Sequence, residues 1–209
     1  MMLRTMIFGA LFALGACGDR AGSQAGSQGQ APVAGGAQGG CLTRAYDHIG
    51  GPISLIDHMG EAVTEADFKG AHSLVYFGFT YCPDICPASL VTIERALRRL
   101  PEGVTAPRTI LISIDPERDT PEAMASYIST NAFPDDIVGL TGSLEAVTAA
   151  ADTFVSPFLK IEDPDSLAEY TMDHTSIVYL MDEDWQLKTF FTHEATAEIM
   201  GDCLAQHLG

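Results

Sequence analysis

The alternation of apolar and polar residues along the chain predicts a mixed α/β domain. Unbroken apolar runs at 74–79 and 109–114 are typical of central strands covered on both faces. Apolar residues three or four positions apart predict a helix within 89–100. The other predicted elements are a hairpin of 53–56 and 62–64, helices beginning at Thr120, Ser143 and Thr196, short strands at 137–140 and 158–161, and a second hairpin of 175–181 and 187–191.

The order of these elements is βαβαβ followed by ββα. It predicts a mixed central sheet with helices on both faces, three layers in all, which is a thioredoxin-like fold with an added N-terminal β-hairpin. Functional groups in such sheets lie beyond the carboxyl ends of the parallel strands. We therefore expect chemistry in the connection after 74–79 and in the segment that follows 109–114.

The N-terminus is typical of an exported lipoprotein. Residues 1–16 contain one basic residue, Arg4, then an apolar run too short to span a bilayer and two small residues before Cys17. The tetrapeptide LGAC resembles a bacterial lipobox, which makes Cys17 the expected lipidation site; the alternative is a cleaved signal peptide with an incidental cysteine. Residues 17–40 are rich in Gly, Ser, Gln and Ala and predict a flexible tether, so the folded domain is expected at 41–209.

The net charge of −17 argues against nucleic acid as a partner, because nucleic acid is bound through lysine and arginine. Such a charge suits a well-solvated exported domain, and it also suits a cationic partner.

Four of the five cysteines remain once Cys17 is assigned to lipid, and an even number in an exported protein permits disulfides. Cys41 and Cys203 lie at opposite ends of the predicted domain and form a structural disulfide if the termini meet. The alternative is that Cys203, among apolar residues at helical spacing, is an ordinary buried thiol.

Cys82 and Cys86 lie in the stretch FGFTYCPDICP, between a strand and a helix. Pro87 disfavours helical backbone at Cys86, so we expect Cys86 to be an N-cap or to lie in a turn, with Pro87 opening the helix. A nearby helix N-terminus favours the thiolate, which attacks disulfides and binds metals. The spacing fits a redox pair, a two-sulfur clip for copper(I) or a buried structural pair. A structural zinc site needs four protein ligands, and no second cysteine pair has matching spacing.

A histidine would complete a metal site, and the chain has six, at positions 48, 58, 72, 174, 193 and 207. His174 directly precedes the strand predicted at 175–181, so we expect it at a loop-to-strand junction. His193 follows the last predicted strand and is the main rival. Location alone does not decide between them, because a single histidine more often serves structure than metal binding.

Four motifs follow one another along the chain: FGFTYCPDICP, ISIDPERDTPE, LTGS and YTMDHTSIVYLMD. In this order and at these intervals they resemble the Sco/SenC family of copper-binding proteins, and the resemblance covers nearly all of residues 41–209. The combination is far more specific than any single motif.

The resemblance implies a thioredoxin-like fold and a copper site formed by Cys82, Cys86 and His174, holding copper(I), copper(II) or both. The family's acidic residues in the DPERDT loop fall on Asp115 and Asp119. We interpret these two as supporting or docking residues rather than ligands.

The function that the resemblance implies is delivery of copper to the dinuclear centre of a haem-copper cytochrome oxidase. The expected partners are the copper-centre subunit of cytochrome c oxidase, a periplasmic copper donor and the membrane, through the lipid anchor. The expected location is the periplasmic side of a bacterial membrane, the inner one. The alternative is a membrane-tethered thiol:disulfide reductase that keeps the acceptor cysteines reduced. His174 distinguishes the two, because disulfide exchange requires the cysteine pair but no distant imidazole.

Overall fold

The structure is a computed structural model that describes Cys41, Tyr46 and residues 48–209. The predicted signal peptide, the lipidation candidate Cys17 and the tether at 18–40 lie outside these residues. Within the described part of the chain, no helix is both long and apolar enough to cross a membrane.

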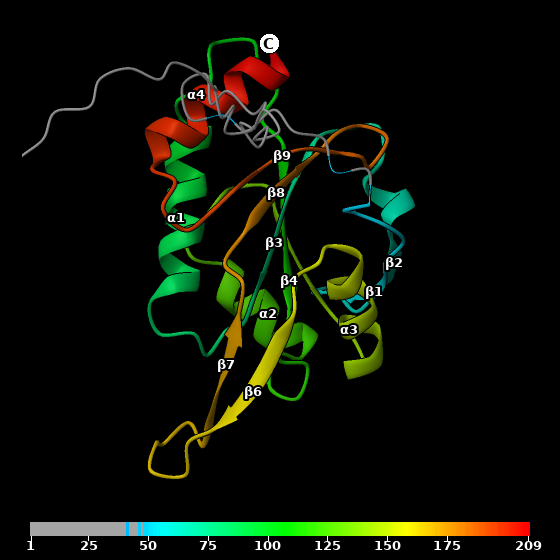
Figure 1. The fold of residues 1–209 in the computed structure, drawn as a ribbon, viewed down its shortest axis with the longest axis vertical. Helices are drawn as coiled ribbons and strands as arrows, with labels where there is room; N and C mark the ends of the chain where they lie inside the picture. Colours follow the sequence, from blue (N-terminus) through cyan, green and yellow to red (C-terminus); the bar gives the residue numbers. More distant parts are fainter. Residues whose placement is uncertain (1–40, 42–45, 47) are drawn as a thin grey trace, which may run out of the picture. The chain divides into compact units, whose positions relative to one another are not determined.

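A seven-stranded mixed sheet forms the centre of the domain, in the order β2-β1-β5-β4-β3-β8-β9 (Figure 1). The three middle strands β3, β4 and β5 are parallel, and the other neighbours pair antiparallel. This is the mixed thioredoxin-like sheet that the sequence predicted, with the N-terminal hairpin added at one edge. The strands are β1 (Ser54–Asp57), β2 (Ala62–Thr64), β3 (Ser73–Gly78), β4 (Arg108–Ser113), β5 (Ile137–Thr141), β8 (Val178–Met181) and β9 (Leu187–Phe191).

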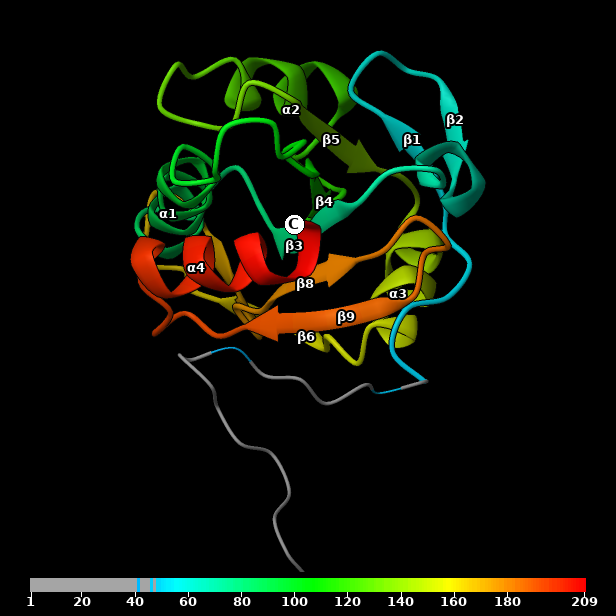
Figure 2. The same ribbon diagram turned by 90° about the horizontal axis from the view of Figure 1, so that it is seen from above.

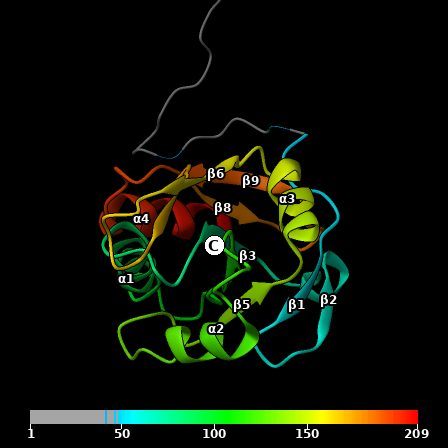
Figure 3. The same cartoon turned by 90° about the horizontal axis from the view of Figure 1, so that it is seen from below.

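Helices cover both faces of this sheet. Figures 2 and 3 show α1 and α4 together on one side and α3 on the other. The helices are α1 (Ile85–Leu97), α2 (Pro121–Ile128), α3 (Leu144–Thr153) and α4 (Ala197–Leu208), and a short 3-10 turn, η1 (Glu65–Phe68), follows β2. The arrangement confirms the predicted three layers.

The three predicted helix starts are confirmed. Thr120, Ser143 and Thr196 each stand at an N-cap, and each side-chain oxygen accepts the backbone N–H of the third residue onward. These bonds satisfy donors that have no partner inside the helix. Pro121 occupies the first helical position of α2, where its missing N–H costs nothing.

The central strand β3 is buried along its whole length, and its side chains alternate between two layers of the core. The ring of Phe77 packs against Phe154, at the end of α3, with centroids 5.4 Å apart. Tyr76 points to the opposite face, where its ring lies 6.3 Å from that of His174. A strand buried on both faces explains why its sequence is an unbroken apolar run.

Two further strands form a separate antiparallel hairpin that extends beyond the main sheet (Figure 1). They are β6 (Phe158–Glu162) and β7 (Tyr170–His174), with Phe158 opposite His174. The sequence predicted β6 but no strand at 170–174. His174 was expected directly before a strand, and in the structure it is instead the last residue of β7. The signal that was missed is a short alternation, since Tyr170 and Met172 are buried while Thr171 and Asp173 are exposed.

Candidate functional site

The two cysteines of FGFTYCPDICP lie where β3 passes into α1. The expectation that Pro87 opens the helix was wrong: α1 begins at Ile85, with Asp84 as its N-cap. Cys86 and Pro87 are therefore its second and third residues, and Ala88 donates the first helical hydrogen bond, to the Asp84 carbonyl. Proline fits this early position because N–H groups in the first turn need no partner within the helix.

The sulfur of Cys82 accepts a hydrogen bond from the backbone N–H of Cys86, with 3.3 Å between the atoms. Cys86 is fully buried and Cys82 is partly exposed, and both are free thiols. Hydrogen bonding from the Cys86 thiol, reinforced by N–H groups of the helix start, lowers the pKa of Cys82 to about 5. The same hydrogen bond, together with burial, raises the pKa of Cys86. At neutral pH the pair therefore presents one accessible thiolate, on Cys82.

A glycine makes room for the buried sulfur. A Cβ atom at Gly78, the last residue of β3, would lie 3.1 Å from the Cys86 sulfur and 3.0 Å from the Tyr76 ring. Such contacts are closer than carbon atoms normally allow, so a side chain at this position would push Cys86 out of place. The glycine that precedes the cysteines in this motif therefore serves the packing of Cys86.

His174 reaches the cysteines from the end of β7. Its Nε2 atom lies 3.8 Å from the sulfur of Cys86, and its Nδ1 atom lies 3.0 Å from the carbonyl oxygen of Thr175. A carbonyl only accepts, so Nδ1 carries the proton and Nε2 presents its lone pair to the cysteines. Burial lowers the pKa of His174, so the ring stays neutral at pH values at which an exposed histidine would begin to be protonated.

A depression in the surface opens onto Cys82 and His174. It is lined by Phe79, Cys82, Pro83, Asp84, Ile85, Thr171, Met172, Asp173, His174 and Ser176. The sulfur of Cys82 and the imidazole thus line one recess, with Cys86 beneath them in the core. The recess therefore presents one sulfur and one nitrogen on its open side, and the second sulfur, that of Cys86, is buried next to the imidazole.

His193, the rival histidine, is exposed beyond the end of β9. It lines a neighbouring depression together with His174 and Ile85. His58, in the N-terminal hairpin, accepts a hydrogen bond from the backbone of Gly139 at Nδ1. Of the six histidines, His174 is the one whose ring nitrogen lies close to the sulfur of Cys86, at 3.8 Å.

Asp119 supports the cysteine loop through hydrogen bonds to its carboxylate. Its carboxylate accepts hydrogen bonds from the hydroxyl and the backbone N–H of Thr80 and from the hydroxyl of Ser113. Thr80 is two residues before Cys82, so these bonds tie the loop to the end of β4. Asp119 is fully buried, and burial raises its pKa. A role in docking, one of the two expected from the sequence, is wrong for a side chain that no partner can reach.

Asp115 holds β7 in place through Tyr170, the first residue of that strand. It is 2% exposed, accepts a hydrogen bond of 2.8 Å from the hydroxyl of Tyr170 and pairs with Arg118. The docking role is wrong for Asp115 too, for the same reason.

Arg118 connects the two halves of the site. Its guanidinium carbon lies 3.6 Å from the centre of the Tyr170 ring and 4.4 Å from that of Tyr81, the residue before Cys82. It also donates to the carbonyl oxygens of Ala168 and Tyr170. One planar cation thus holds the cysteine loop and the strand that carries His174. Sequence reasoning missed Arg118, Tyr170 and Thr80; the DPERDT motif was the available signal, but it does not reveal their partners.

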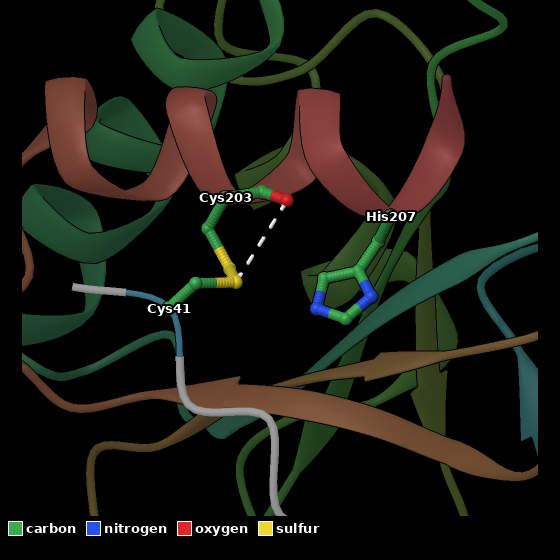
Figure 4. A group of neighbouring side chains, drawn as sticks. All are labelled: Cys41, Cys203 and His207. Atoms are coloured by element: carbon green, nitrogen blue, oxygen red, sulfur yellow. Dashed lines mark hydrogen bonds between the residues drawn. A yellow bond between two sulfur atoms is a disulfide. The ribbon is translucent and has the colours of Figure 1, made fainter. Parts of the chain in front are cut away.

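At the other end of the domain, Cys41 and Cys203 form a disulfide that closes a separation of 162 residues. Cys203 lies in α4 and is fully buried, and Cys41 is 1% exposed. His207 lies next to them, as Figure 4 shows.

The comparisons with known proteins agree on one family. A profile of the family SCO1/SenC matches residues 43–209. The human "Protein SCO1 homolog, mitochondrial" is 39% identical over 165 residues, which cover 77% of this chain and 53% of the relative. The chain belongs to the SCO1/SenC family.

Two solved SCO1/SenC structures are similar to this one. Arabidopsis thaliana ScoI "with copper bound" is 34% identical, with a TM-score of 0.71 over 76% of this chain and 96% of that one. Bradyrhizobium japonicum ScoI "with copper bound" is 38% identical, with a TM-score of 0.67 over 77% and 99%. They confirm the predicted fold. The chain spans only about half the length of the human relative.

Proposed function

We propose that this protein is a copper metallochaperone that binds copper through Cys82, Cys86 and His174. It delivers the ion to the dinuclear copper centre of a haem-copper cytochrome oxidase. The observation that carries the proposal is the position of the His174 Nε2 lone pair, 3.8 Å from the Cys86 sulfur and beside the same recess as Cys82.

The chemistry of the three side chains suits copper as cargo. Two sulfurs and an imidazole hold copper(I) in a three-coordinate arrangement, and copper(II) gains a water or another oxygen. The open side of the recess gives an incoming thiolate a path to the ion, so that ligands are exchanged one at a time. A closed site of four protein ligands would hold metal for structure instead. The copper-bound relatives support the choice of ion.

The partners in this proposal are the copper-centre subunit of cytochrome c oxidase and a periplasmic copper donor. Lipidation at Cys17 tethers the domain to the periplasmic side of a bacterial inner membrane. The sequence of residues 1–40 supports this part of the proposal through its short apolar run, its LGAC tetrapeptide and its Gly- and Ser-rich stretch.

The second candidate function is thiol:disulfide reduction of the acceptor's cysteines. The observation in its favour is the lowered pKa of Cys82, about 5, beside a buried partner thiol. In such an exchange the Cys82 thiolate attacks an acceptor disulfide and forms a mixed disulfide. Cys86 then attacks Cys82, releasing the reduced acceptor. His174 has no task in these steps, and this is why we rank the chaperone role first.

A titration with copper separates the two functions. The protein is prepared with Cys82 and Cys86 reduced and the Cys41–Cys203 disulfide intact, as verified by mass spectrometry of unreduced peptides. Copper(I) is then titrated without oxygen against a chromophoric chelator, and copper(II) is followed by its thiolate charge-transfer absorption. We expect one ion per chain, lost in Cys82→Ser and Cys86→Ser.

His174→Ala is the decisive variant, and His193→Ala is its matched control, since both histidines line the same depression. We expect His174→Ala to weaken copper(I) at least about tenfold, because even the outer partners of a ligand contribute about 10- to 100-fold. His193→Ala should bind like the parent. If His174→Ala bound copper normally while the parent rapidly reduced an acceptor disulfide, the reductase would be the better assignment.

A further inference from the structure

A second group of two cysteines and one histidine lies far from the first. The possible ligand atoms of Cys41, Cys203 and His207 all lie within 4.8 Å of one another. Figure 1 shows α4 beside α1. Gly201 of α4 lies next to Ala96, near the end of α1, whereas Cys86 stands at the start of α1. In Figure 4 the side chains of Cys203 and His207 leave α4 on the same side, toward Cys41.

The spacing on α4 explains this geometry. Cys203 and His207 are four residues apart, so they lie on one face of the helix, one turn apart. Cys41 approaches that face from the N-terminal side of the domain and supplies the second sulfur. A pair of ligands one helical turn apart, completed by one residue from elsewhere, is a common way to build a metal site.

His207 has a nitrogen without an evident structural use. Its Nε2 atom is buried, and no hydrogen-bond partner for it occurs among the described residues. Buried polar atoms are normally paired, so this imidazole nitrogen, next to two sulfurs, is available to a ligand. His207 also lies in the last turn of α4, where the negative end of the helix dipole favours a cation.

We propose that Cys41, Cys203 and His207 form a second copper(I) site, which opens when their disulfide is reduced. Both sulfurs are buried, so reduction requires a local opening of the fold that admits a small dithiol. This dithiol supplies two electrons: the S–S bond breaks, the dithiol becomes a disulfide, and its two protons pass to Cys41 and Cys203. Binding of one copper(I) by both sulfurs then releases these two protons. In the oxidised form the same sulfurs join the start of the domain to α4, so the group alternates between a covalent link and a metal site.

Copper(I) fits this group better than zinc. Copper(I) is a soft ion that accepts two thiolates and one imidazole as a complete set. Zinc requires a fourth ligand, and the group in the described part of the chain has three members. Cys41 and Cys203 belong to the hydrophobic core, where water is a poor source of the missing ligand, and His207 is partly buried beside them.

The test uses the full chain with Cys82→Ser and Cys86→Ser, which removes the thiols of the first site. Copper(I) is titrated against a chromophoric chelator without oxygen, first with the disulfide intact and then after reduction by a water-soluble phosphine. Circular dichroism verifies that the fold survives reduction. We expect no copper(I) to bind in the oxidised form beyond the chelator background, and one equivalent in the reduced form.

His207→Ala on this background should weaken the reduced site at least about tenfold. His72→Ala is the control, because it removes a histidine that is close enough to act electrostatically on His207 but is not part of the group, and it should bind like its parent. Failure of the reduced parent to bind copper(I), equal binding by the His207→Ala variant, or displacement of copper(I) by equimolar zinc would each overturn the proposal. None of these results bears on the first site, whose titration keeps the disulfide intact.

Discussion

The Nε2 atom of His174 lies 3.8 Å from the sulfur of Cys86, although 88 residues separate them in the sequence. The two residues come from different substructures, the β6–β7 hairpin and the start of α1. Their meeting therefore depends on the contacts that fix the hairpin against the cysteine loop. Asp115, Asp119 and Arg118, all from the segment after β4, supply those contacts.

Arg118→Met should weaken copper binding without removing a ligand. The substitution removes the cation between Tyr81 and Tyr170 and leaves Asp115 buried without its charge partner. We expect copper(I) affinity to fall about 10- to 100-fold, as is typical for residues that orient ligands. The free energy of unfolding should fall by about 3–5 kcal/mol, the usual result of breaking a buried ion pair. Chelator competition and urea unfolding measure the two effects.

Arg108→Met is the matched control for Arg118→Met. Arg108 pairs with Asp136 at the protein surface, where both side chains are largely exposed. Its loss should change stability by less than about 1 kcal/mol and leave copper affinity unchanged. If Arg118→Met and Arg108→Met bound copper equally well, Arg118 would not position the site.

Asp119→Asn should loosen the loop that carries Cys82. The carboxylate accepts three hydrogen bonds, two from Thr80 and one from Ser113. An amide has one oxygen and places N–H groups opposite donors, so at least one buried donor loses its partner. We expect a loss of about 1–3 kcal/mol in the free energy of unfolding, measured with urea. Hydrogen exchange at the Thr80 amide should rise, and protection equal to that of the parent would show that Asp119 does not hold the loop.

The layout of the fold was largely predictable because its signals are local. The buried strands β3 and β4 have unbroken apolar sequences, and the N-caps Thr120 and Ser143 are read directly from residue type. The strand β7 was missed because five residues with a mostly polar exposed face give a weak alternation. The start of α1 is not readable from Pro87, because the third position of a helix tolerates proline as the first does: neither N–H has a partner within the helix.

The site was predictable only in part, because its members meet through tertiary contacts. The cysteines were identifiable from their own motif, but position alone left His174 and His193 undecided, and the family resemblance made the choice. The roles of Asp115 and Asp119 were not readable, since sequence does not show that an acidic residue is buried. The pairing of Cys41 with Cys203 likewise depends on where the two ends of the domain meet.

Removing the Cys41–Cys203 disulfide should destabilise the domain. The link closes a separation of 162 residues, so it strongly restricts the unfolded chain. We expect the double variant Cys41→Ala/Cys203→Ala to lose about 2–5 kcal/mol in the free energy of unfolding. Phosphine reduction of the parent should produce a loss of similar size, which controls for the changed side chains. A difference below about 0.5 kcal/mol between parent and double variant would show that the link contributes little to stability.

Cys82 should react as a thiolate across the neutral range. Its pKa is lowered to about 5 from the ordinary 9.0, so lowering the pH from about 8 to about 6 leaves the thiolate almost fully populated. The rate of alkylation of the metal-free protein by iodoacetamide should therefore be nearly constant over that range. A model cysteine peptide would instead slow about tenfold per pH unit. Peptide mass spectrometry should locate the label on Cys82, because Cys86 is buried and its pKa is raised.

The variant Cys86→Ala tests the cause of the lowered pKa. It lacks the thiol that donates a hydrogen bond to Cys82, which is the largest cause of the shift, so the pKa of Cys82 should rise and the alkylation rate should again depend on pH. A parent rate that fell about tenfold per pH unit would show that the Cys86 thiol and the helix start do not stabilise the Cys82 thiolate.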